Sequence, residues 1–239
     1  MLSRSAALAL LLSAAAVLAQ TPASQPPSMK SFHLQDFDMT FIYPGDFIPA
    51  DPKATAPTTY ALPTTHPANP PCDQAPLSVG SATAPGRPAI VISILDDACP
   101  SVLHDAQKIG EFTQAQLLRQ LQRYGTPTLT PYLGQSTHLF TLDGRSAALT
   151  LGSATPVASA SNTSTATPPI TTYAAKLCTV GPDPVFVPAK SRHQPAGPKP
   201  IVCFDFTAHQ SDQITTLLAL PIIFGEYQPR SLVAPNQIK

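Results

Sequence analysis

Four side chains that could bind a metal ion or exchange protons lie just after the most apolar segment of the chain. Asp96 and Asp97 follow the run 89–95 directly, and His104 and Asp105 come a few residues later. Carboxylates at the end of a buried strand beside a histidine are a recognised site geometry. The same residues also have structural explanations, since Asp96 and Asp97 end a strand and Asp105 suits the N-cap of a helix. No Asp-x-Asp or His-x-x-x-His spacing supports a metal site, so the structural explanation is favoured.

A second set of polar residues has the types needed for nucleophilic catalysis. Its members are His138, Asp205 and His209, with Ser136, Ser146 or Ser153 as the nucleophile. No Gly-x-Ser-x-Gly motif accompanies them. The chain also lacks a P-loop and a Gly-x-Gly-x-x-Gly motif, and it has only 11 glycines. We therefore expect no catalytic residue, no metal site and no cofactor.

The four cysteines are widely spaced, at Cys72, Cys99, Cys178 and Cys203. No Cys-x-x-Cys pair indicates redox catalysis or a zinc ribbon, and an even number in an oxidising compartment predicts two disulfides. Three pairings are possible, and we favour Cys72 with Cys99 and Cys178 with Cys203. Each would close a loop of about 25 residues and stabilise the fold by about 3 kcal/mol. Free reactive thiols are the alternative.

The first residues predict export. Arg4 gives a positive start, an apolar run follows over residues 6–17, and Val17 and Ala19 are small residues suited to a cleavage site. The run is shorter than the roughly 20 residues that span a membrane, which disfavours an uncleaved anchor. We expect removal of residues 1–19 and a secreted or periplasmic protein.

The charge of the chain excludes some partners. Its 14 Lys and Arg balance its 14 Asp and Glu. A neutral chain has no long-range field that attracts polyanions, so we expect no nucleic-acid partner. After cleavage we expect no integral membrane segment, and the partner is expected to be an unknown protein or small ligand of the cell envelope.

The 29 prolines are clustered and divide the chain. Their distribution predicts one domain at 32–227 after a disordered leader at 20–31, with a tail at 228–239. Pro-, Ala-, Thr- and Ser-rich stretches at 49–88, 153–170 and 188–200 lack apolar periodicity and are expected to be low-complexity insertions.

Several segments between these connections predict strands. Alternating apolar residues indicate a strand over 39–43, and the β-branched run 89–95 indicates a buried one. Asp143-Gly144 inside 137–151 predicts a hairpin with a type I′ turn. Further strands are expected at 171–180 and 201–209.

Two segments predict helices. Apolar residues recur at helical spacing from Ile109 to Tyr124, after a cap at Asp105, and Leu117, Leu118 and Leu121 are expected to be buried. Ser211 is expected to cap a short second helix. Helices that are separate from consecutive hairpins predict an α+β fold.

The order of these elements resembles the exported PsbP-like family, which includes extrinsic photosystem proteins and many bacterial proteins of unknown role. The similar segments are 41–47, 90–95, 112–124, 142–145 and 201–220. The resemblance implies an α/β/α sandwich in which an amphipathic helix and a C-terminal helix pack on an antiparallel sheet. The insertions at 49–88 and 153–170 and the four cysteines depart from the family pattern. No catalytic motif belongs to the family as a whole, so the resemblance assigns no functional residue.

Two functions follow from the sequence. The favoured one is a non-enzymatic exported module for binding or envelope assembly. The alternative is a hydrolase or metal-dependent enzyme that uses Asp96, Asp97 and His104. The alternative requires those three side chains to converge in a concave pocket.

Overall fold

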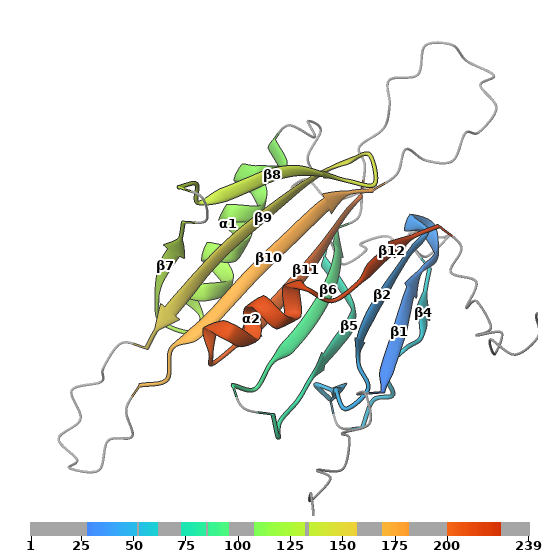
Figure 1. Cartoon of the computed structure of the whole chain (residues 1–239), viewed down its shortest axis with the longest axis horizontal. Coiled ribbons are helices and arrows are strands. Elements are labelled where there is room, and N and C mark those ends of the chain that lie inside the picture. Colours follow the sequence, from blue (N-terminus) through green and yellow to red (C-terminus); the bar gives the residue numbers. More distant parts are fainter. Residues whose placement is uncertain are drawn as a thin grey trace, which may run out of the picture.

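The computed structural model of the chain describes residues 28–51, 53–61, 73–84, 86–95, 108–131, 134–156, 169–181 and 200–225. These residues form a large sheet, a small sheet and two α-helices (Figure 1). Strands predominate, and nearly all of their pairings are antiparallel. The fold is therefore a mostly antiparallel sheet protein with two helices, which agrees with the predicted α+β class.

The large sheet has eight strands, all paired antiparallel. The hairpin of β8 (Thr137–Leu142) and β9 (Arg145–Thr155) turns at Asp143 and Gly144, whose φ angles of 50° and 74° are the two positive values of the predicted type I′ turn. The strand order is β3 (Ile48–Pro49), β5 (Asp73–Gly80), β6 (Ala89–Leu95), β11 (Ile201–Ala208), β10 (Thr172–Val180), β9 (Arg145–Thr155) and β7 (Thr126–Thr130), while β8 (Thr137–Leu142) also pairs with β9.

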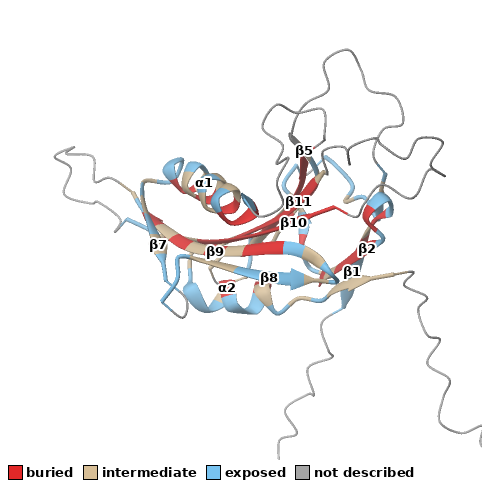
Figure 2. Cartoon of the chain, turned by 90° about the horizontal axis from the view of Figure 1, so that it is seen from above, coloured by how far each residue is buried: buried red, intermediate tan, exposed pale blue. Residues whose placement is uncertain are grey.

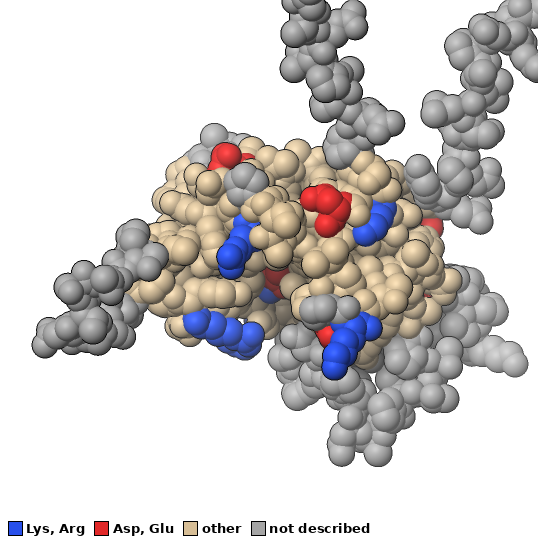
Figure 3. Space-filling view, turned by 90° about the horizontal axis from the view of Figure 1, so that it is seen from below, with Lys and Arg blue, Asp and Glu red and all other residues tan. Residues whose placement is uncertain are grey.

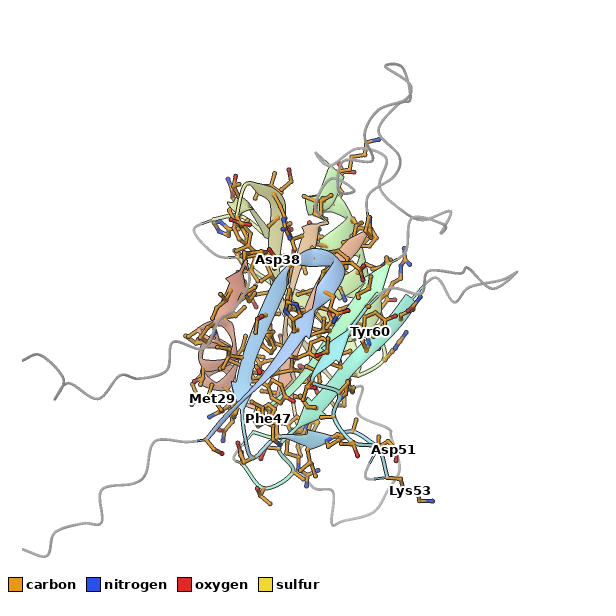
Figure 4. The ribbon with its side chains drawn as sticks, turned by 90° about the vertical axis from the view of Figure 1, so that its right-hand side faces the viewer. Met29, Asp38, Phe47, Asp51, Lys53 and Tyr60 are labelled. Carbon is orange, nitrogen blue, oxygen red and sulfur yellow. A yellow bond between two sulfur atoms is a disulfide. The ribbon has the colours of Figure 1, made fainter. Side chains whose placement is uncertain are left out.

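The small sheet has four strands in the order β12 (Ile222–Phe224), β2 (Met39–Pro44), β1 (Met29–Leu34) and β4 (Thr59–Tyr60). A short 3-10 helix, η1 (Gln35–Phe37), and a left-handed Asp38 connect β1 to β2. Figure 4 shows Asp38 at one end of this pair of strands and Met29 at the other. The Tyr60 hydroxyl donates a hydrogen bond to Gln74 of β5, which ties the edge of the small sheet to the large one.

The two faces of the large sheet have different covers. Helix α1 (Ile109–Gln122) lies on one side, and α2 (Ser211–Leu218) lies on the other (Figure 2). The small sheet shares the side of α2, because the Phe41 ring packs 5.4 Å from the Phe204 ring and 6.4 Å from the Phe206 ring. The main hydrophobic core therefore lies between the two sheets.

Strand alternation separates two surfaces on the central strands. The surface toward the small sheet, called the core face, includes Ile90, Ile92, Ile94, Phe204 and Phe206, all of them buried. The opposite surface, called the cleft face, includes Ser93, Lys176, Cys178, Cys203 and Asp205.

Small residues allow α1 to approach the cleft face. Leu117 and Leu121 are fully buried against Ala154 and Ala174, as the helical spacing predicts. A Cβ atom on Gly152 would lie 2.8 Å from Leu121 Cδ1, so glycine is needed there for close packing. Leu118 is half-buried, which makes the prediction of its burial wrong. Adjacent helical residues point about 100° apart, so Leu118 cannot share the direction of Leu117.

Some predicted boundaries are wrong. Strand β1 begins inside the expected leader 20–31, and β5 lies inside the expected insertion 49–88. Strand β5 was not predicted because it contains Pro76, and a proline cannot donate a backbone hydrogen bond within a central strand. The structure places Pro76 at an irregularity of register between Gln74 and Leu77. Strand β1 contributes few residues to the core. It forms a strand through its pairing with β2, in which Phe32 lies opposite Phe41.

The helix caps also differ from the prediction. Gln210, in an extended conformation, is the N-cap of α2, so Ser211 already belongs to the helix and does not cap it. The N-cap of α1 is Lys108, and neither Lys108 nor Gln210 forms a capping hydrogen bond through its side chain. The expected cap Asp105 lies outside the described residues.

Candidate functional site

Asp96, Asp97, His104 and Asp105 lie between β6 and α1, outside the described residues. Within the described ranges, no three His, Cys, Asp or Glu residues lie close enough to hold a metal ion.

The candidate triad is not assembled. Across the strands, His138 pairs with Leu149, Leu149 with Leu177 and Leu177 with Phe204, so His138 lies on the side of the core face. Asp205 lies on the cleft face instead. His209 follows Asp205 by four residues, about 13 Å along an extended chain, and its backbone N–H donates to Gly86. These residues therefore have separate positions in the sheet.

A cavity of about 580 Å³ lies between α1 and the outer part of the cleft face. It forms because α1 packs mainly on β7, β8, β9 and β10 and leaves this side of β5, β6 and β11 without a helix. We call it the α1 cleft. Its sheet side is lined by Ala75, Val91, Ser93, Leu95, Lys176 and Asp205, and its helix side by Gln116, Arg119, Gln120, Arg123 and Tyr124.

An ion pair forms part of the cleft floor. Lys176 and Asp205 face each other across β10 and β11, and Lys176 Nζ donates to Asp205 Oδ1. Their side chains are only 9% and 10% exposed. An isolated charge at such a depth would be costly, and each partner offsets the charge of the other. The floor is thus polar and electrically balanced.

A disulfide lies next to this pair on the same face. Cys178 pairs with Cys203 across β10 and β11 with a Cα–Cα separation of 4.1 Å. Each cysteine is two residues from one member of the ion pair, so both pairs occupy successive same-face positions. The bond is one of the two that the sequence favours, and it holds together the two strands that form the floor. Cys72 and Cys99 lie outside the described residues, and their pairing stays a prediction.

The helix side of the cleft contains an unsatisfied acceptor. Gln120 Oε1 is buried and receives no hydrogen bond from the described residues. Leaving such an atom without a donor costs about 1–3 kcal/mol. Buried polar atoms of this kind need an explanation, and one explanation is a group that binds beside them.

The rim of the cleft is basic. Arg119 of α1 and Arg123, the C-cap of this helix, are exposed about one helical turn apart, and neither forms an ion pair with a described acidic residue. Because Asp205 balances Lys176, the described lining has a net charge of about two positive units. The face of the molecule in Figure 3 has few charged side chains, and both signs occur on it.

Sequence reasoning missed Lys176 and the role of Asp205. Each is a single charge within an otherwise apolar strand, in the segments YAAKLC and CFDFTA. Lys176 precedes its cysteine by two residues and Asp205 follows its cysteine by two. Antiparallel pairing of the cysteines therefore places the two charges opposite each other, which is a signal the sequence contains.

Comparisons with known proteins identify one similar structure and no family assignment. No family model and no curated protein matches the chain. The solution structure of PsbP from the cyanobacterium Synechocystis sp. PCC 6803 matches at 12% identity and a TM-score of 0.39, over 84% of this chain and 91% of that one. This is the family that the sequence resembles. A match at this level indicates nothing about ligands or activity.

Proposed function

We propose that this protein is a non-catalytic, exported binding module that holds a small ligand in the α1 cleft. The single observation that supports it best is a cavity of about 580 Å³ with a polar floor and a buried acceptor, Gln120 Oε1. Small-molecule sites typically have volumes of about 300–1,000 Å³ and a few directed polar groups among apolar ones.

The arrangement of the floor favours binding over catalysis. A hydroxyl nucleophile needs a base within hydrogen-bond reach. Ser93 lies on β6, level with Cys178 of β10, so its Cα atom is two strand spacings across and two residues along from that of Lys176, or about 12 Å away. The Lys176 ammonium is held by Asp205 and is not a free base. The enzyme alternative needs Asp96, Asp97 and His104, which lie outside the described residues.

Two observations support export. The N-terminal segment 1–19 has the pattern of a signal peptide. The Cys178–Cys203 disulfide fits a compartment outside the reducing cytoplasm. No helix among the described residues is long and apolar enough to cross a membrane.

A fragment screen tests the cleft. Nuclear magnetic resonance of the full chain with a library of small fragments should shift the amide signals of Ser93, Gln120 and Asp205. Gln116→Trp, which fills the cleft, should abolish these shifts. Ala115→Trp introduces the same side chain at a neighbouring exposed position that does not line the cleft, and it should leave the shifts unchanged. Shifts that persist in Gln116→Trp would contradict the proposal.

A further inference from the structure

We propose that the ligand of the α1 cleft is a small organic carboxylate that also has a hydroxyl group and an aromatic or other apolar body. This inference rests on the proposed binding function and names the chemistry of its ligand. Three features of the lining support it: two guanidinium groups that form no ion pair with a described acidic residue, one buried amide oxygen that receives no donor from the described residues, and a set of apolar side chains.

The charge of the rim selects an anion. Arg119 and the C-cap residue Arg123, whose backbone is still helical, are four residues apart, so their side chains lie on the same helical face about 6 Å apart at the Cβ atoms. A guanidinium group binds a carboxylate with two parallel N–H donors. Lys176 adds no free charge, because Asp205 already pairs with it. The anionic group of the ligand is therefore expected beside α1, near the end of the helix.

The two arginines also oppose the negative end of the helix dipole. Partial charge at a helix C-terminus amounts to about half an elementary charge, less than either guanidinium provides. Compensation of the dipole explains how the two arginines stabilise the helix, but it predicts no ligand. A binding measurement therefore separates the two roles.

Gln120 requires a second polar group on the ligand. A carboxylate has no hydrogen to give to Gln120 Oε1, which receives none from the described residues. A hydroxyl group both donates and accepts, so it also satisfies the side-chain amide if its oxygen and nitrogen are exchanged. The ligand thus needs a hydroxyl in addition to its charge.

Apolar side chains complete the site. Val91 and Leu95 line the sheet side, and Tyr124, which is 45% exposed, lies at the end of α1. An aromatic ring stacks favourably on a tyrosine and buries apolar area against the two aliphatic residues. An aromatic hydroxy acid combines all three requirements, and 4-hydroxybenzoate is the smallest convenient probe.

Calorimetric titration of the full chain, with its disulfide intact, tests the inference with three probes. The dissociation constant for 4-hydroxybenzoate should be at least about tenfold lower than for neutral 4-hydroxybenzamide or for benzoate, which lacks the hydroxyl. Arg119→Gln/Arg123→Gln should weaken binding of the acid about tenfold or more and leave the amide unchanged. The matched control Arg87→Gln/Lys108→Gln removes the same charge at exposed positions outside the cleft and should have little effect.

The outcomes separate this inference from the proposed function. Equal affinity for the acid and the amide, an unchanged affinity in the arginine variant, or no binding of any probe overturns the carboxylate ligand. If fragments still shift the cleft amides and Gln116→Trp still blocks them, the binding function stands with a different ligand. If those shifts also fail, both proposals are overturned.

Discussion

The two faces of β10 and β11 are stabilised in different ways, although alternate residues of the same two segments form them. On the core face, Phe204 and Phe206 pack against Phe41 of the small sheet. On the cleft face, the ion pair and the disulfide take the place of large apolar side chains. One face is fully covered and specifies the fold by packing, whereas the other is half-covered and retains polar groups beside a cavity.

Phe204→Ala should have the largest effect on stability. Phe204 is fully buried on the core face, and such a truncation removes apolar contacts and leaves a cavity. We expect the free energy of unfolding to fall by about 4 kcal/mol, measured by urea titration. Val91→Ala, on the half-covered cleft face, should cost about 1 kcal/mol or less. Similar losses for the two variants would show that the faces do not differ as described.

Removal of the disulfide should rank second. Cys178→Ala/Cys203→Ala opens a loop with a sequence separation of 25 and should lower stability by about 3 kcal/mol. The double variant is preferable to chemical reduction, because a reductant would also act on any bond of Cys72 and Cys99. A midpoint of thermal unfolding equal to that of the wild type would mean that packing alone holds the cleft floor.

Lys176→Met should have an intermediate effect. It leaves the Asp205 carboxylate buried without its cation. A fully enclosed pair typically costs more, but water in the adjacent cleft can solvate Asp205, so we expect a loss of about 2 kcal/mol. Lys176→Met/Asp205→Leu should recover most of it by denaturant titration. If the double variant had the same free energy of unfolding as Lys176→Met, the two charges would be stabilised mainly by groups other than each other.

The smallest effect concerns Tyr43 and alkaline pH. Burial on the core side raises the pKa of Tyr43 above its usual value of about 10. The unfolded chain therefore releases this proton at a lower pH than the native state, and stability falls as the pH rises above about 10. Tyr43→Phe lacks this proton, so its stability should decline less steeply between pH 10 and 11, by less than about 1 kcal/mol. If the free energies of unfolding of the two proteins, measured by denaturant titration, declined equally across that pH range, the assignment to Tyr43 would be contradicted.

Local patterns predicted most of the regular elements. The run 89–95 is β6, the Asp143-Gly144 pair makes the β8–β9 turn, and the leucine spacing of α1 buries Leu117 and Leu121. These features depend on neighbours in the chain, because side-chain periodicity and positive φ angles are local properties. The same reasoning did not predict β5, because Pro76 is tolerated in this strand only through an irregularity in the pairing of β5 with β6.

The sequence by itself determined the alternation that gives β10 and β11 two unlike faces, and the cysteine spacing contained the partnership of Lys176 with Asp205. Only the tertiary structure decided where the cleft lies. Helix α1 covers β9 and β10 because small residues such as Gly152 admit its leucines, and it leaves the neighbouring strands open. A cavity depends on the distance between elements far apart in the chain, and no local pattern encodes that distance.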